Sequence, residues 1–310
     1  MGVNQNKYKI ERKLGEEGFT EVYLIKKDNK KYVLKKIKEK LNEKEIKEIT
    51  KIINILSKIN NNYIIKYYYT FKEKDSFNII MEYAGDKNLK QFINDYKIDS
   101  RLIPEEIIVD FIYQLVKGLQ YIHKNNLIHR DLTPDNIFID ENNKIKIGGF
   151  GIIKILTETN KYIKDQIGKI HYIAPEIESG EKYNNKIDIY SLGCIIYELL
   201  TLNEYYTDKK IQKECKINEE IYNNKWQELI NLLIKKDHHE RPDIEKVYNL
   251  ICTDEKIKSF IFNEKEEYKC LKKKDLLKRI KRDDGEYLKA KKENKLYFLR
   301  SKYLLNIITN

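Results

Sequence analysis

Three polar side chains in this chain have types and spacings that suit chemistry on a phosphoryl group. Asp131 follows His129 and Arg130, and Asn136 stands five residues after Asp131. A carboxylate can orient a hydroxyl and accept its proton, and an amide oxygen can hold a metal ion. Lys35 closes an apolar segment, and its ammonium could neutralise phosphate charge. The alternatives are ordinary turn chemistry for Asp131 and Asn136 and a plain surface lysine for Lys35.

The elements that must position these side chains follow from the spacing of the apolar residues. Residues 8–37 and 63–84 alternate between turn signals, which predicts strands, and the alternation places Lys35 on the side opposite Leu34 and Lys36. Helices are expected at 43–59, 107–123 and 186–202, the last of them buried on most faces, with short strands at 136–148. The sequence therefore predicts an α+β chain with a small strand-rich part before a larger helical part.

Several short motifs occur in a fixed order along the chain. They are Gly15 to Val22, Tyr32 to Lys35, His129 to Asn136, Gly149-Phe150-Gly151, Ala174-Pro175-Glu176, Asp188 to Gly193, and Arg241. One motif alone is weak, but the ordered set at these spacings is specific. Over residues 8–250 the chain resembles the eukaryotic protein kinases, and the segments 167–177 and 183–202 look most like the NimA-related Ser/Thr kinases.

The resemblance implies a two-lobed protein-kinase fold and a set of site residues. The kinase domain would span 8–252, with a β-rich N-lobe at about 8–83 and a helical C-lobe at about 84–252. ATP would be the nucleotide, Mg²⁺ its counter-ion, and a protein hydroxyl the acceptor. Asp131, Lys35 and Asn136 would be catalytic, and Asn136 would also hold the metal ion. The residues implied in ATP binding are Gly15, Gly18, Val22, Val33, Lys35, Met81, Glu82, Ala84 and Phe138.

The resemblance also implies two features of the scaffold. One is an internal apolar spine anchored by Asp188, and the other is a buried ion pair between Glu176 and Arg241. The spine residues would be Leu56, Tyr67, His129 and Phe150.

Two departures from the kinase pattern concern the charges that hold the nucleotide. Gly149 stands where the family has its metal-binding Asp, and a glycine has no side-chain oxygen that could bind Mg²⁺. Loss of one preorganised electrostatic group typically slows a reaction by about 10²–10³. Ile52 stands where the family has the helix glutamate that pairs with Lys35, and Glu48, one turn earlier, could replace it.

Further departures lie in the loops around the site. Glu17 and Thr20 replace two glycines of the loop that approaches phosphate. Thr133 and Lys169 look exchanged relative to the family, so the Lys169 ammonium could reach the place of the missing loop lysine, or the two residues could have drifted independently. Asp165 stands at a NimA-like phosphorylation position and could pair with Arg130 permanently.

The positive charge of the chain is concentrated at its C-terminal end. The net charge is +11, and residues 256–310 alone hold 17 Lys and Arg against 8 Asp and Glu. The main domain is thus nearly neutral, which argues against DNA as a partner. A basic, helical tail is expected over 256–310, where Leu296, Leu299, Tyr303, Leu304, Ile307 and Ile308 have amphipathic spacing. This tail could pack on its own domain, or it could bind an anionic partner or a membrane surface.

The compartment is expected to be cytoplasmic, with the nucleus not excluded. The four cysteines are scattered without metal-binding spacing, which is typical of reduced thiols in a reducing compartment. No apolar run is long enough for a transmembrane segment, and the N-terminus has no signal-peptide pattern.

Three functional hypotheses fit this sequence. The first is a nucleotide-binding pseudokinase, in which Gly149 has impaired catalysis. The second is an active but atypical Ser/Thr kinase, supported by the joint survival of Lys35, Asp131 and Asn136. The third is a scaffold that acts through its basic tail on a protein partner or an anionic surface.

Overall fold

A computed structural model describes most of the kinase-like part of the chain. The described residues are 8–17, 19–38, 41–73, 76–140, 142–150, 170–205, 216–218 and 220–253. The chain divides into two units, Met1–Asp254 and Glu255–Asn310, and all described residues lie in the first unit. Gly18, Asp165, Lys169 and the tail 256–310 lie outside the described residues, so the expectations about them stay predictions.

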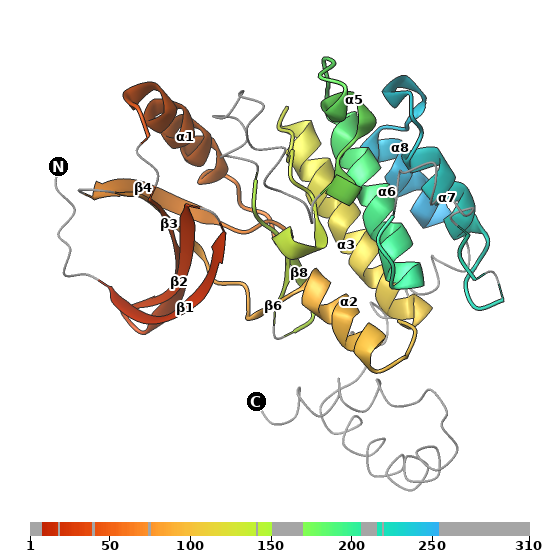
Figure 1. Cartoon of the computed structure of the whole chain (residues 1–310), viewed down its shortest axis with the longest axis horizontal. Coiled ribbons are helices and arrows are strands. Elements are labelled where there is room, and N and C mark those ends of the chain that lie inside the picture. Colours follow the sequence, from red (N-terminus) through yellow and green to blue (C-terminus); the bar gives the residue numbers. More distant parts are fainter. Residues whose placement is uncertain are drawn as a thin grey trace, which may run out of the picture. The chain divides into compact units, whose positions relative to one another are not determined.

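The first lobe is a five-stranded antiparallel sheet with one helix packed on it (Figure 1). The strands have the order β1-β2-β3-β5-β4. They are β1 (Lys9–Glu17), β2 (Thr20–Lys27), β3 (Lys30–Ile37), β4 (Tyr67–Glu73) and β5 (Ser76–Glu82). Helix α1 (Glu43–Leu56) begins with a capping box in which Asn42 and Glu45 satisfy each other's backbone N–H groups. Its apolar stripe buries Ile49, Ile53 and Leu56, and the helix packs on β4.

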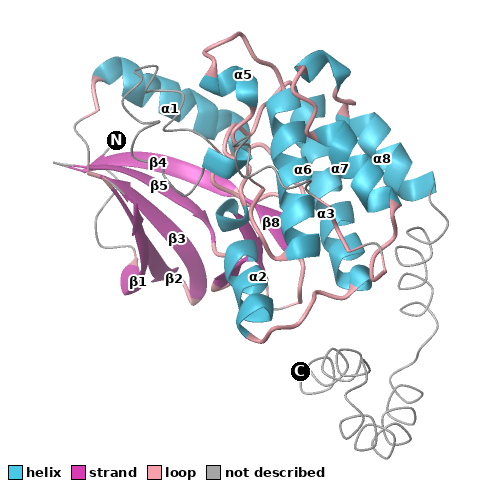
Figure 2. Cartoon of the chain, turned by 45° about the vertical axis from the view of Figure 1, so that its right-hand side comes forward, coloured by secondary structure: helices cyan, strands magenta, loops and turns pink. Residues whose placement is uncertain are grey.

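The second lobe is mainly helical, as Figure 2 shows by its colours. Its helices are α2 (Leu89–Ile98), α3 (Glu105–Lys124), α5 (Pro175–Glu178), α6 (Lys186–Thr201), α7 (Lys225–Leu233) and α8 (Ile244–Thr253). Short 3₁₀ turns are η1 (Pro134–Asn136), η2 (Ile170–Tyr172) and η3 (His238–Glu240). Helix α6 packs against α3 and α7 and is buried almost all round, as its sequence predicted.

A second, smaller sheet follows the segment that links the first lobe to the second (the linker). Its strands are β6 (Lys87–Asn88), β7 (Ile137–Ile139) and β8 (Ile145–Ile147), in the order β6-β7-β8. The linker reaches this sheet through Gly85, which has a φ of +107°. A Cβ at Gly85 would lie 2.5 Å from the carbonyl oxygen of Ile139, so the close passage of the linker over β7 requires glycine.

The predicted fold class is confirmed, since a β-rich lobe precedes a larger helical lobe in an α+β arrangement. The element bounds differ from the expectations by a few residues at most, as is usual where helix ends fray. No described helix has the length and apolar content needed to cross a bilayer.

Candidate active site

One face of the N-lobe sheet gathers the residues expected to hold the nucleotide. Val22 lies directly opposite Lys35 in the β2–β3 ladder, and Val33 lies opposite Met81 in the β3–β5 ladder. Directly opposed residues share a face, and so do residues two apart on one strand. These four side chains therefore point to the same side of the sheet.

Lys36 lies on the opposite face, as the strand alternation predicted. Its Nζ is 3.5 Å from a carboxylate oxygen of Glu73. This contact holds the Lys36 ammonium on the face of the sheet opposite to the expected nucleotide. Lys35 is therefore the lysine of the pair that β3 presents with Val22 and Val33.

The residues expected around the adenine come from the end of β5, from the linker and from β7. Met81 and Ala84 are buried at the end of β5 and just beyond it. The ring of Phe138 on β7 lies so close to Gly148 that a Cβ there would be 3.1 Å from it. Glu82 is fixed by its side chain, which accepts a hydrogen bond from the Lys66 N–H at 3.0 Å and contacts Lys146 Nζ at 2.9 Å. These contacts fix Glu82 at the end of β5, where its backbone would meet the adenine.

The loop expected over the phosphates lies between the antiparallel strands β1 and β2, whose register shifts between Ile10 and Arg12 and between Lys13 and Gly15. The β1–β2 ladder continues from Gly15 opposite Val22 to Glu17 opposite Thr20. A Cβ at Gly15 would meet nothing within 4 Å, so this position faces open space. Gly18 lies outside the described residues, and its expected role stays untested.

A buried carboxylate ties this hairpin to its neighbours on the outer face. Glu21 contacts Lys38 at 2.7 Å and Lys13 at 3.1 Å, and it accepts a hydrogen bond from the Tyr23 hydroxyl at 2.9 Å. These partners, led by Lys38, lower the pKa of Glu21 to about 2. Glu21 thereby links β1, β2 and the end of β3.

The loop that contains His129, Arg130 and Asp131 is anchored by Asp188, which lies in the first turn of α6. The buried Asp188 carboxylate accepts the backbone N–H of His129 at 2.9 Å and that of Arg130 at 3.0 Å. It also lies 2.9 Å from His123 Nε2. Arg130 has a φ of +67°, an unusual conformation for this residue type, and its contact with Asp188 fixes it. The backbone that bears Asp131 is therefore preorganised.

Asn136 bonds directly to Asp131, the residue expected to be catalytic. Its Nδ2 donates to the backbone oxygen of Asp131 and to Asp131 Oδ2, both at 2.8 Å. Both partners are acceptors, so the network itself assigns Nδ2 to this side of the amide and Oδ1 to the other. The amide oxygen consequently points towards Gly149.

The place of the missing carboxylate is filled by Asn136. Gly149 has a φ of +68°, and a Cβ built there would lie 2.1 Å from Asn136 Oδ1 and 2.3 Å from its Cγ. No side chain fits at residue 149 unless the Asn136 amide moves. Gly149 and Asn136 are thus sterically coupled, which the sequence did not reveal.

Position 149 offers no side-chain ligand for Mg²⁺. Mg²⁺ prefers octahedral oxygen ligands and usually takes one or two carboxylates together with phosphate oxygens. Residue 149 supplies none, and Asn136 offers one neutral oxygen. These two positions are therefore poor ligands for Mg²⁺, while Lys35 and the apolar residues on the same sheet face are of the types expected to hold a nucleotide.

Three of the four expected spine residues contact one another, and the fourth is buried. The ring of Phe150 lies 4.7 Å from that of His129 and 6.0 Å from that of Tyr67, and Leu56 is buried. His129 Nε2 is 2.7 Å from the carbonyl oxygen of Gly148.

The hydroxyl of Tyr67 adds a contact that the sequence interpretation missed. It accepts hydrogen bonds from the backbone N–H groups of Gly149 and Phe150, while burial raises its pKa well above the ordinary value. A buried tyrosine hydroxyl needs a polar partner, which was the available signal.

The expected replacement for the helix glutamate is not formed. Residues 35 and 48 are both described, and no ion pair between Lys35 and Glu48 occurs in this part of the chain. Glu48 instead lies along an outer side of α1 with Lys44, Lys47 and Lys51. The prediction that Glu48 substitutes for residue 52 is therefore not borne out among the described residues.

Thr133 occupies the position of the expected loop lysine. It is 2% exposed, and its Oγ1 has no hydrogen-bond partner among the described residues. Whether Lys169 reaches it lies outside those residues.

The C-lobe anchors are present, with one network beyond those expected. Arg241 donates to both carboxylate oxygens of Glu176, at 2.7 and 2.8 Å, in full burial. The buried Glu198 of α6 contacts Lys90 Nζ at 2.6 Å and accepts a hydrogen bond from the Tyr172 hydroxyl. This network fixes η2 to the lobe, and a buried Glu in an otherwise apolar helix was its sequence signal.

Comparison with known proteins agrees with this geometry. A family model described as protein kinase domain matches residues 8–251. Human serine/threonine-protein kinase Nek11 is 30% identical over 269 residues, which cover 82% of this chain and 42% of that protein. The probable serine/threonine-protein kinase nek2 of Dictyostelium discoideum is 34% identical over 258 residues, covering 78% of this chain and 62% of that protein.

A third relative extends the agreement. Human serine/threonine-protein kinase Nek5 is 31% identical over 254 residues, covering 78% of this chain and 36% of that protein. The chain matches less than two thirds of the length of each of these relatives. The chain belongs to the eukaryotic protein kinases, among their NimA-related Ser/Thr members.

Proposed function

We propose that this chain is a nucleotide-binding Ser/Thr kinase domain whose phosphoryl transfer is weakened. The observation that carries this proposal is the pair Gly149 and Asn136, in which an amide fills the position of the metal-binding carboxylate. ATP would lie against Val22, Val33, Met81, Ala84 and Phe138. Lys35 would neutralise its phosphates.

The chemistry left to this chain is positioning and proton acceptance. Asp131 would orient the acceptor hydroxyl of a protein substrate and receive its proton. Asn136 would be the remaining metal ligand. Mg²⁺ would supply charge neutralisation between the phosphates if it were bound, and the weakened site would limit that contribution.

An active, atypical kinase is the second candidate, and one observation favours it. Asp131 is held by two backbone anchors of its loop and by Asn136, and Lys35 keeps its place on the nucleotide face. The preorganised loop supports a role for Asp131 in orienting the acceptor hydroxyl, although the metal-binding Asp is replaced by Gly149.

A purified-protein assay separates the two candidates. Nucleotide binding is measured by the nucleotide-induced rise in Tm, with Mg²⁺, with Mn²⁺ and with a chelator. We expect binding that depends little on the divalent ion. K35A should abolish it, and K36A is the matched control because Lys36 pairs with Glu73 on the other face. Equal loss in both variants would contradict the assignment of Lys35.

Phosphoryl transfer is measured on the chain itself and on a generic protein substrate. We expect turnover at least about 10²–10³ below that of ordinary kinases. Magnesium-dependent turnover at ordinary rates that D131A abolishes would establish the second candidate instead.

A cytoplasmic location and a partner-binding role for the tail remain predictions. The tail role is tested by pull-down and liposome binding with and without residues 256–310. Binding that is insensitive to salt would argue against an electrostatic tail contact.

A further inference from the structure

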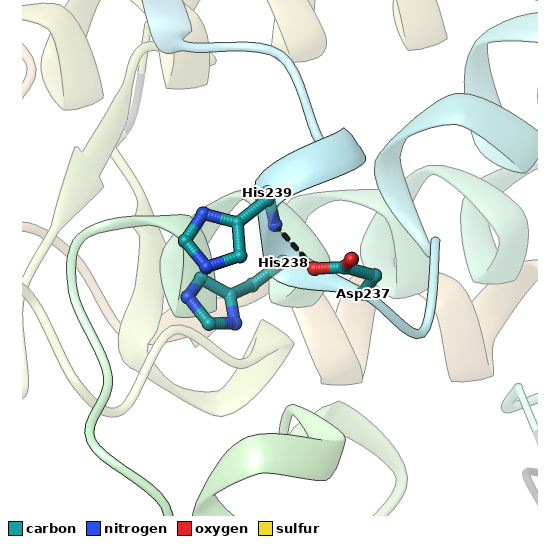
Figure 3. A group of neighbouring side chains, drawn as sticks. All are labelled: Asp237, His238 and His239. Atoms are coloured by element: carbon teal, nitrogen blue, oxygen red, sulfur yellow. Dashed lines mark hydrogen bonds between the residues drawn. The ribbon is translucent and has the colours of Figure 1, made fainter.

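The turn between α7 and α8 brings together side chains that bind transition metals, as Figure 3 shows. It contains Asp237, His238 and His239, and one ligand atom of each lies within 4.8 Å of the others. Asp237 and His239 are exposed and His238 is half-buried. Imidazole nitrogens and a carboxylate oxygen are ligands that Zn²⁺, Ni²⁺ and Cu²⁺ accept.

The backbone of this turn is fixed from both sides. Asp237 Oδ1 accepts the backbone N–H of His239 at 2.8 Å, which fixes the carboxylate to the backbone of the turn. The buried Arg241 donates to the carbonyl oxygens of Lys235 and Lys236, at 2.7 and 3.2 Å. The ligand-bearing segment therefore starts from a preorganised backbone, and only the three side chains must adjust.

The adjustment needed for coordination is small. An ion at the centre of a triangle with 4.8 Å sides would lie about 2.8 Å from each donor, against bond lengths of about 2.0–2.2 Å. Each donor must move by about 0.7 Å, which small rotations of the three side chains supply. The second oxygen of Asp237 and the remaining lone pairs of the first can still accept an ion.

The two histidine rings lie against each other. Their centroids are 4.1 Å apart and their planes differ by 35°. The nearby Lys235 is paired with Glu240 at 3.5 Å, which reduces its repulsion of a cation.

We propose that Asp237, His238 and His239 form a surface site for a divalent transition-metal ion such as Zn²⁺, with water completing the coordination. This site is separate from the nucleotide site. It supplies three protein ligands and keeps an open position, so the ion exchanges readily. Bound metal would stabilise the turn that Arg241 anchors.

The test uses the full chain without an affinity tag, stripped with chelator and with its thiols alkylated, because cysteines also bind zinc. Zn²⁺ is titrated by calorimetry, and Co²⁺ is titrated through its visible absorption. We expect one ion per chain with micromolar affinity. H238Q/H239Q should weaken binding by about tenfold or more. H171Q is the matched control, since His171 is only partly buried and pairs with Glu204.

Two further measurements test the proposed ligands independently of folding. D237N keeps an N-cap acceptor, so the turn should fold normally while metal affinity falls. Zn²⁺ should raise the Tm of the unaltered chain and not that of H238Q/H239Q. Equal affinity in the unaltered chain and the double variant would overturn the proposal. So would binding only at millimolar metal in every variant, which would mean adventitious ions.

Discussion

Replacing Gly149 with alanine tests the steric coupling at the active site without adding a metal ligand. The new methyl group would overlap the Asn136 amide, whose Oδ1 lies 2.1 Å from the required Cβ position. The side chain of Asn136 must therefore leave its two hydrogen bonds to Asp131. A neutral bond contributes about 0.5–1.5 kcal/mol and one to a charged group about 1.5–3 kcal/mol.

The expected cost has two parts that a control separates. The left-handed backbone costs an alanine about 1–2 kcal/mol. Displacing Asn136 adds about 2–4 kcal/mol. Gly180 has a φ of +71° with nothing within 4 Å of a Cβ, so G180A should show the backbone part alone. The change in unfolded-chain entropy from glycine to alanine is common to both variants and cancels.

Denaturant unfolding gives the free energy of unfolding for each variant. We expect G149A to lose about 3–6 kcal/mol and G180A about 1–2 kcal/mol. In an N136A background G149A should cost little more than G180A, so the double-mutant cycle should report about 2–4 kcal/mol of coupling. If G149A and G180A cost the same, Asn136 does not fill the vacated place and the reasoning fails.

Three other changes test contacts described above. E21Q should remove the stability that the ionised Glu21 carboxylate contributes. Because the pKa of Glu21 in the folded chain is lowered to about 2, this contribution is present above about pH 4.5 and is lost as the pH falls towards 2. The difference in Tm between E21Q and the unaltered chain should therefore shrink in acid. Y67F should cost about 1–3 kcal/mol in denaturant unfolding, since the N–H groups of Gly149 and Phe150 lose a buried acceptor, and an unchanged value would place that hydroxyl elsewhere. R241A should cost about 3–5 kcal/mol by leaving the buried Glu176 carboxylate unpaired, and adding E176Q should recover part of the loss.

The sequence predicted those features that follow from local periodicity. Lys35 was separated from Lys36 because a strand alternates its faces at every residue, whatever surrounds it. The apolar stripe of α1 was found for the same kind of reason. The same helix also shows the limit of such patterns. Glu48 has the right spacing to face Lys35, but whether it reaches Lys35 depends on the position of the helix along its axis, which no sequence pattern encodes.

The arrangement around Gly149 could not be predicted for a different reason. The orientation of Asn136 depends on the volume left by a residue thirteen positions away and on two acceptors of Asp131. The sequence showed that a ligand was missing, and it could not show that another side chain had moved into its place. The hydroxyl of Tyr67 was likewise visible as a group in need of a partner, without indication of which partner it finds.

The loop that bears Asp131 is anchored in the core of the C-lobe. The buried Asp188 carboxylate fixes the backbone of His129 and Arg130, and Asp188 is not one of the residues expected to hold nucleotide or metal. The packing of the C-lobe therefore sets the conformation of these two residues. Under the proposed function, a folded kinase domain would persist even where chemistry at position 149 is weakened.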